Sequence, residues 1–369
     1  MSRRRISRQA ERGDPLQGVV GRTYADTTGC FTSELACEWD RLCDLLRSPP
    51  WLRPAWTTAW WQAFGAGRGR LTLLWVRRGD RLVGVAPMME RGRLLASPTN
   101  YHSPGYGFVA LDQAAAAELA TAALQRSRAT TWSFVDQGDP TQQALLGAAS
   151  RRRLSVTRIL EHPPYVSTVC AWADYEARLD TKLQRDLRRR ERRLAEEGTL
   201  DLSIETGPED LEANLEDCFR TEAASWKGAQ GTAMSSQPAT RRFYSEIARF
   251  THSRGELMLA FLRLDGQPIA TQLNLCSGNT VTVLKLGHDE AYSRFAPGKL
   301  LVRHVLQHCF AGPTTCYDFS GHSNAYKMEW ADDTRPLLET RTYSAAPADV
   351  AAWASFRFGR PLAKRVLGR

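Results

Sequence analysis

The chain has 369 residues, of which 43% are hydrophobic and 24% charged, so it is long enough to bury a sizeable core as two domains of ~150 residues. Its mean hydropathy is −0.40, and no apolar run approaches the ~18 residues that a membrane-spanning helix needs. No apolar segment follows the basic N-terminal residues, so we expect no secretory signal and a soluble, cytoplasmic protein. The eight cysteines form no C-x-x-C pair, which favours reduced thiols over a disulfide framework or a structural zinc site.

The charges are unevenly distributed. Five arginines and one glutamate in residues 1–13, with five basic residues and no acidic one in residues 355–369, account for the formal net charge of +9. The neutral remainder of the chain gives little support to a nucleic-acid partner that the protein would have to envelop. Only 6 of the 49 basic residues are lysines, and none precedes residue 182. Where arginine is the usual cation, a retained lysine indicates a need for its compact ammonium group.

In the first half of the chain the pattern predicts helices mixed with strands. A hairpin is expected at residues 71–86, where two apolar runs flank a polar turn, and an irregular stretch follows at residues 97–107. The other predicted elements are helices at Pro54–Phe64, Ala114–Gln125 and Pro140–Ala149 and strands at Thr131–Val135 and Leu154–Leu160.

An arginine-rich helix is predicted next, at Lys182–Gly198, with a narrow apolar stripe of Leu183, Leu187 and Leu194. Its basic cluster from Arg185 to Arg193 has two interpretations. It contacts phosphates of an RNA, or it is the solvated face of a linker helix, which is the simpler interpretation.

The second half predicts a fuller set of elements. Its strands are expected at Leu200–Thr206, in a hairpin at residues 257–272, at Thr280–Gly287, at Thr315–Phe319 and near Arg341–Ser344. Its helices are expected at Glu209–Ala224, Ala239–Ser253, Lys299–Phe310 and around Asn324–Trp330.

The two halves resemble each other. Residues 71–86 and 257–272 align without a gap, and each segment follows an amphipathic helix. Self-similarity at this spacing favours duplication of one unit over two unrelated hairpins. We therefore predict an α+β protein of two tandem units, each a mixed central sheet flanked by helices.

The predicted boundaries divide the chain into five parts. These are a basic flexible tail (1–30), a first unit (31–165), a linker strand with the arginine-rich helix (166–198), a second unit (199–345) and a basic tail (346–369). The irregular stretch 97–107 stands where the second unit has a strand and a phosphate-type loop. We therefore expect the ligand site in the second unit, with the first unit degenerate.

Two loops in the second unit place polar groups beside helices. The loop Tyr292–Lys299 joins a strand to a helix, whose free N–H groups and positive dipole end suit phosphates, although Pro297 has no N–H and an ordinary helix cap is the alternative. The segment Tyr317–Trp330 crowds polar groups at the carboxyl end of a strand, where open sheets place ligands. Its Gly321-His322-Ser323 resembles a nucleophile elbow, but no histidine follows to complete a hydrolase triad.

An ordered series of segments carries a family resemblance over roughly residues 35–340. The chain resembles the GNAT acyltransferases, in the branch with the cellulose-biosynthesis-type (CelD/BcsL) proteins, and it is similar in plan to the tandem-GNAT Fem peptidyltransferases. The segments are Trp56–Gly65, Ser225–Gly228, Arg242–Tyr244, Leu264–Ala270, Leu284–Lys285 with Asp289–Glu290, Phe295–Gly298, and Tyr317–Phe319 with Tyr326–Lys327 and Trp330.

The resemblance implies acyl transfer from acyl-CoA, without a metal, to an amine of a small-molecule or glycan acceptor. It implies donor binding by a loose form of the GNAT pyrophosphate loop, with Arg294, Phe295, Gly298 and Lys299. Two other functions stay open. One is a Fem-type transferase that uses aminoacyl-tRNA, bound through the Arg185–Arg193 segment, and the other is a non-catalytic binding or assembly protein.

Acyl transfer needs a neutral amine, a polarised carbonyl and a protonated leaving group. We assign Lys327 to a phosphate or the developing oxyanion, Asp318 or Asp289 to deprotonation, and Tyr326 to protonation of the leaving group. The alternatives are an ion pair for Asp318 and a packed aromatic ring for Tyr326. The predicted substrate-binding residues are Trp226, Lys227, Lys285 and His288, with Lys227 on an anionic part of the acceptor.

Overall fold

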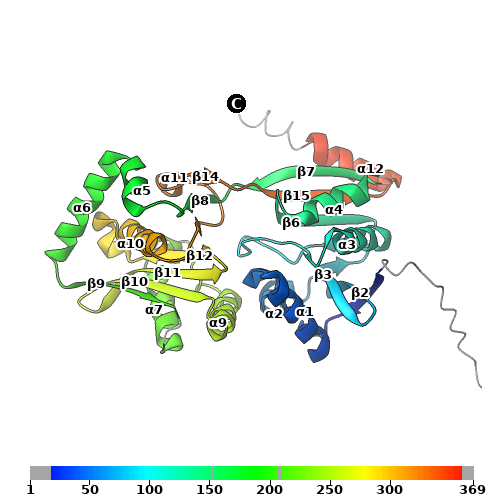
Figure 1. Ribbon diagram of the computed structural model, residues 1–369, viewed down its shortest axis with the longest axis horizontal. Coiled ribbons are helices and arrows are strands. Elements are labelled where there is room, and N and C mark those ends of the chain that lie inside the picture. Colours follow the sequence, from blue (N-terminus) through cyan, green and yellow to red (C-terminus); the bar gives the residue numbers. More distant parts are fainter. Residues whose placement is uncertain (1–17, 151–152, 207–208, 360–369) are drawn as a thin grey trace, which may run out of the picture.

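The computed structural model describes residues 18–150, 153–206 and 209–359, and the chain folds into two units side by side (Figure 1). Each unit is a mixed β-sheet flanked by helices, which confirms the predicted fold class. Within the described ranges, no helix combines the length and the apolar character that crossing a membrane requires.

The first sheet has the strand order β1-β2-β3-β4-β6-β15-β7, and β5 pairs with β3. Its strands are β1 (Val19–Tyr24), β2 (Arg70–Arg78), β3 (Arg81–Arg91), β4 (Leu94–Ala96), β5 (Val109–Ala110), β6 (Ala129–Asp136), β7 (Leu154–Glu161) and β15 (Leu337–Tyr343). Only β4 and β6 pair in parallel.

The second sheet has the strand order β9-β10-β11-β12-β13-β8-β14. Its strands are β8 (Pro164–Ser167), β9 (Leu200–Glu205), β10 (Leu257–Leu264), β11 (Gln267–Ser277), β12 (Thr280–His288), β13 (Cys316–Asp318) and β14 (Asp333–Thr334). The turn between β10 and β11 has positive φ at both Asp265 and Gly266, as a two-residue hairpin turn requires. Only β12 and β13 pair in parallel.

Apart from β5, which has no counterpart in the second sheet, the two sheets match strand for strand, with the parallel pair at the same place in each order. This correspondence agrees with the predicted duplication. It also shows an exchange between the units, because β8 follows the first unit in sequence yet lies in the second sheet, whereas β15 follows the second unit yet lies in the first.

The helices cover the sheets (Figure 1), and each predicted helix is present. Those of the first unit are α1 (Ser33–Leu46), α2 (Pro54–Trp60), α3 (Gln113–Arg126), α4 (Pro140–Ala149) and α12 (Pro347–Ala354). The helices that follow it are α5 (Trp172–Arg178), α6 (Thr181–Ala195), α7 (Leu211–Ala223), α8 (Trp226–Ala229), α9 (Pro238–Ser253), α10 (Pro297–Ala311) and α11 (Ala325–Met328). Of these helices, α1, α5, α8 and α12 were not predicted. Short turns of helix add η1 (Pro50–Leu52), η2 (Trp61–Gly65), η3 (Glu290–Phe295) and η4 (Ser355–Gly359).

Three expectations about the chain ends and boundaries are corrected. The tail expected at residues 1–30 contains β1, which pairs with β2, while residues 1–17 lie outside the described part. The tail expected at residues 346–369 begins with α12, which packs on the first sheet and whose Trp353 donates its indole N–H to Ser155 O at 3.2 Å. The strand expected to close the second unit is β15, which pairs instead with β6 and β7.

An aromatic core joins the units. Trp56 and Trp60 of α2 pack with Phe243 of α9, which is completely buried, and the Trp56 and Phe243 rings meet edge to face at 5.3 Å. The irregular stretch 97–107 also reaches this boundary, because His102 is buried and stacks on Phe64 at 5.0 Å. The first unit is therefore fixed against the helices that cover one face of the second sheet.

Candidate active site

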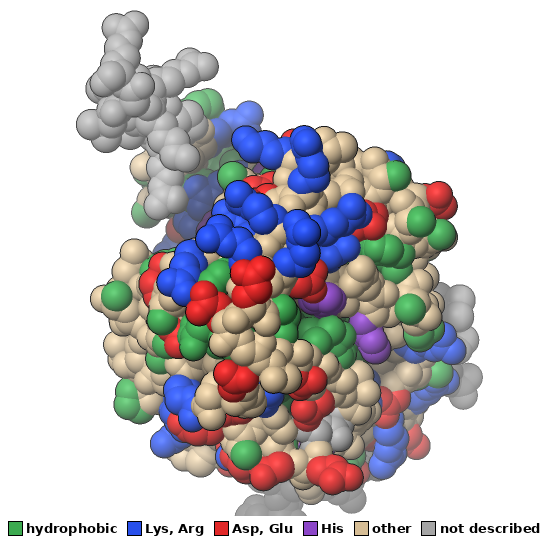
Figure 2. Space-filling model, turned by 90° about the vertical axis from the view of Figure 1, so that its left-hand side faces the viewer, with side chains coloured by type: hydrophobic (Ala, Val, Ile, Leu, Met, Phe, Trp, Pro, Cys, Tyr) green, Lys and Arg blue, Asp and Glu red, His purple; other side chains and the backbone are tan. Residues whose placement is uncertain are grey.

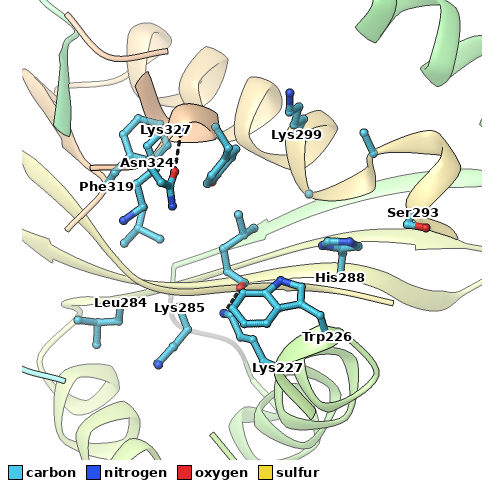
Figure 3. Close-up of a pocket in the computed structure, with 15 residues that line it drawn as sticks. Trp226, Lys227, Leu284, Lys285, His288, Ser293, Lys299, Phe319, Asn324 and Lys327 are labelled. Atoms are coloured by element: carbon cyan, nitrogen blue, oxygen red, sulfur yellow. Dashed lines mark hydrogen bonds between the residues drawn. The ribbon is translucent and has the colours of Figure 1, made fainter. Parts of the chain in front are cut away.

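A cavity opens where two parallel strands separate. β12 pairs with β13 only over Thr280–Thr282, whereas β12 itself continues to His288. The cavity has a volume of about 590 Å³, and α10 begins at its wall (Figure 3). Its lining residues are Trp226, Lys227, Val283, Leu284, Lys285, Leu286, His288, Ser293, Ala296, Gly298, Lys299, Phe319, Asn324, Tyr326 and Lys327.

The N-terminus of α10 forms one end of the cavity. Ala296 precedes the helix in a left-handed conformation (φ 50°, ψ 50°), and its carbonyl oxygen accepts the N–H groups of Lys299 and Leu300. Gly298 is one residue inside the helix, where N–H groups lack an acceptor within the helix itself. The Lys299 ammonium pairs with Glu329, and burial lowers the pKa of the neighbouring His288.

A buried ion pair supports the opposite wall. Lys227 of α8 donates from Nζ to Glu222 Oε1 at 2.8 Å and to Leu286 O of β12 at 2.6 Å (Figure 3). Glu222 is completely buried, and its second carboxylate oxygen accepts the Met234 N–H at 2.7 Å. A Cβ atom on Gly287 would lie 2.7 Å from Glu222 Cα, so this glycine allows α7 to approach β12.

Glu222 is not among the site residues predicted from the sequence. The signal available was its position on the apolar face of α7, in line with Leu215, Cys218 and Phe219. An acidic residue at such a position indicates a buried partner. Lys227 is that partner.

Two further lysines line the cavity with little compensating charge. The Lys285 ammonium lies 5.2 Å from the centre of the Tyr244 ring, and the Tyr244 hydroxyl is 2.8 Å from His102 Nδ1. Lys327 donates from Nζ to Ser320 O. Burial lowers the pKa of Lys285 and of Lys327 to about 8 each.

The two predicted catalytic aspartates do not reach the cavity wall. Asp318 accepts a hydrogen bond from the Arg335 guanidinium at 2.7 Å and from the Ser320 N–H at 2.7 Å. The ion pair weighed as the alternative for Asp318 therefore exists, with an arginine instead of a lysine. Asp289 caps η3 by accepting the Ala291 N–H at 2.9 Å.

Of the remaining predicted site residues, some line the cavity and others do not. Tyr326 lines the cavity, and burial raises the pKa of its hydroxyl. Arg294 is exposed and pairs with Glu197 at 3.0 Å, while Phe295 is buried in the core beneath α10. The cavity thus brings together Trp226, Lys227, Lys285, His288, Gly298, Lys299, Tyr326 and Lys327.

Histidines on α10 serve a structural contact. His304 Nε2 is 2.7 Å from Glu191 Oε1 on α6. Across the described ranges, no cluster of three or more His, Cys, Asp or Glu side chains is arranged to hold a metal ion.

Residues 181–328 match the family model of the acetyltransferase (GNAT) domain. Over these residues the chain is similar to GNAT acetyltransferases. The matched segment includes the whole cavity lining. No curated protein sequence matches the chain significantly.

Of the following three solved structures, two share the fold with a TM-score above 0.5, at low sequence identity. The C-terminal domain of a protein assigned as a lysylphosphatidylglycerol synthetase from Agrobacterium fabrum is 12% identical, with 87% of this chain and 94% of that chain covered and a TM-score of 0.55. FemX is 10% identical, with 88% and 97% covered and a TM-score of 0.54. A tandem GNAT protein from the clavulanic acid biosynthesis pathway is 14% identical, with 89% and 99% covered and a TM-score of 0.42.

Lys227→Ala tests whether the ion pair with Glu222 supports the cavity wall. The substitution leaves a buried carboxylate without its partner, so we expect a loss of about 3 kcal/mol or more in the free energy of unfolding, measured by chemical denaturation. The exposed Arg242→Ala is the control and should change stability by less than ~0.5 kcal/mol. Adding Glu222→Gln to Lys227→Ala should restore part of the loss. A Lys227→Ala protein as stable as the control would contradict the proposed support.

Proposed function

We propose that the protein is an N-acyltransferase that moves an acyl group from acyl-CoA to an amine of a small-molecule or glycan acceptor. The observation that carries the proposal is the continuous cavity from the N-terminus of α10 to Lys327, beside the part of β12 that β13 leaves unpaired. A helix N-terminus with a lysine suits the phosphates of the donor.

The free edge of β12 supports an extended donor arm with amide groups. Residues 283–288 extend beyond the last pair with β13, so, apart from Leu286 O, which Lys227 holds, their backbone groups on that side need another partner. The pantetheine arm of CoA carries amides that can pair with such an edge, as an added strand does. We assign Gly298 and Lys299 to the phosphates and this edge to the arm.

The proposed chemistry follows from the groups that line the end of the cavity farthest from the N-terminus of α10. The amine nitrogen attacks the thioester carbonyl, the new C–N bond forms, and the C–S bond breaks as the sulfur takes a proton. We assign the Lys327 ammonium to the oxyanion that develops on the carbonyl and the protonated Tyr326 hydroxyl to the leaving sulfur. Asp318 and Asp289 bind other partners, and His288 lies beside Gly298 at the end assigned to the phosphates, so we assign the amine proton to water.

Lys327→Ala tests the assigned chemistry. Loss of a preorganised oxyanion donor should lower kcat by ~100-fold, measured as CoA release from acetyl-CoA with a panel of amines. Acetyl-CoA binding, measured by calorimetry, should stay within threefold, because the phosphates are assigned to the other end. The exposed Arg68→Ala is the control. If turnover by the Lys327→Ala variant is within twofold of that of the unchanged protein, Lys327 does not stabilise the oxyanion.

A second candidate function has its own observation. A groove of about 880 Å³ beside α6 adjoins the first cavity at Lys299. Its charged lining residues are five basic ones, Lys182, Arg185, Arg189, Arg190 and Lys299, and three acidic ones, Asp180, Asp186 and Glu329. Figure 2 shows Lys and Arg side chains gathered on the face of the molecule that carries α6. This arrangement favours a donor with more phosphates than CoA, as in the Fem-type use of aminoacyl-tRNA.

A salt series separates the two donors. If tRNA occupies the groove through about four phosphate contacts, its affinity should fall by ~100-fold between 50 and 200 mM salt, measured by gel shift. The double variant Arg185→Ala with Arg189→Ala should reduce that slope, whereas Arg68→Ala should not. Acetyl-CoA binding together with tRNA binding that is weak and unaffected by the double variant would exclude the Fem-type donor.

A further inference from the structure

The end of the cavity opposite the α10 N-terminus carries more positive than negative charge. Lys227, Lys285 and Lys327 reach it from three different elements, α8, β12 and α11. Glu222 neutralises Lys227. Among the described residues, no carboxylate oxygen lies within 4.0 Å of the ammonium of Lys285 or Lys327.

Lys285 points to the side of the sheet that faces the first unit. In the β11–β12 register it lies opposite Leu273, which is part of the aromatic core between the units. Residues directly opposite each other on paired strands share a face. In Figure 3 Lys285 accordingly leaves β12 away from the side on which Lys299 and Ser293 lie. The donor phosphates and Lys285 therefore belong to opposite sides of β12.

The wall behind Lys285 offers no neutralising group. It consists of the Tyr244 ring of α9 and, behind that, His102 from the irregular stretch of the first unit. Burial lowers the pKa of His102 to about 3, so this imidazole is neutral at physiological pH. The stretch that takes the place of a ligand loop in the first unit thus contributes a neutral wall to the site of the second.

The charged groups around Lys285 and Lys327 are unbalanced. Glu222 of α7 favours the charged form of Lys285, but Lys227 and Lys327 oppose it. Asp318 and Glu161 favour the charged form of Lys327, and Lys227 opposes it. These two carboxylates have other partners, Arg335 for Asp318 and His322 for Glu161.

A bound anion would relieve this imbalance. Ammonium groups that are removed from water and repel one another gain most from a negative partner between them. The thioester carbonyl of the donor is neutral, and the phosphates are assigned to the far end. Lys327 is already assigned to the oxyanion. Lys285 therefore remains available to bind a negatively charged group of the acceptor.

We propose that Lys285 binds a carboxylate or phosphate of the acceptor, so that the acceptor is an acidic amine. This inference rests on the proposed function, because only an acyltransferase would bind the anionic ligand as its acceptor. It differs from the sequence-based assignment, which gave the anion to Lys227. Lys227 is held by Glu222 and Leu286 O, whereas no carboxylate of the described residues lies within 4.0 Å of the Lys285 ammonium.

Matched ligand pairs test the proposal by binding alone. The probes are O-phosphoethanolamine against ethanolamine and glycine against glycinamide, titrated into the full chain with and without saturating CoA and followed by NMR. We expect the acidic member of at least one pair to bind tenfold more tightly. Preference in the first pair alone identifies a phosphate, and preference in the second alone identifies a carboxylate. Equal affinity within both pairs would overturn the proposal.

Variants assign the preference to the residue. Lys285→Met should abolish it, Lys285→Arg should keep it, and Arg68→Met should leave it unchanged. Acetyl-CoA binding should remain within twofold in Lys285→Met, which shows that the variant is folded. A preference that survives in Lys285→Met would overturn the assignment. Absence of acyl transfer to any amine, with the binding preference intact, would instead contradict the proposed function alone.

The pH dependence gives an independent readout. Because the anion binds the charged form of Lys285, whose pKa is about 8, affinity for the acidic probe should fall as the pH rises above 8. Ethanolamine, which carries no acidic group, should show no such fall. An affinity for the acidic probe that is unchanged between pH 7 and pH 9 would contradict a role for the Lys285 ammonium.

Discussion

The separation of β12 from β13 is the constraint on which the candidate site depends. The two strands share three residue pairs and then part, so that β12 extends for six more residues without that neighbour. Two local features enforce the separation. β13 ends at Asp318, whose carboxylate accepts hydrogen bonds from Arg335 and from the Ser320 N–H. The turn that follows has positive φ at Ser320 and Gly321. On its other side β12 has an irregular register with β11 near Leu273.

The ion pair of Lys227 and Glu222 fixes the opened strand. Lys227 holds a backbone carbonyl of β12, and Gly287 admits α7 close enough for the buried carboxylate to reach the lysine. A buried carboxylate is tolerated only when its lone pairs are satisfied, and here Lys227 and the Met234 N–H satisfy them. Because these contacts occupy the Lys227 ammonium, it is not available to bind a substrate. The cationic character of the cavity therefore depends on Lys285 and Lys327.

Local sequence patterns predicted most elements but not how distant segments pair. The hairpins, α9 and α10 were predictable from apolar periodicity and turn residues. The scarcity of lysine pointed to Lys227, Lys285, Lys299 and Lys327, all of which line the cavity. The place of β15 in the first sheet was not predictable, because strand pairing depends on residues that are far apart in the chain. For the same reason the sequence did not show that Arg335 pairs with Asp318, or that His102 contacts the Tyr244 hydroxyl beside Lys285.

The most direct test of the account is amide hydrogen exchange of the full chain with and without acetyl-CoA. If the opened strand and the start of α10 hold the donor, exchange should slow at residues 283–288 and at Gly298–Leu300. The equivalent helix start in the first unit, at the beginning of α3, should not change and serves as the internal control. Unchanged exchange at residues 283–288, or slowing confined to the first unit, would contradict the account.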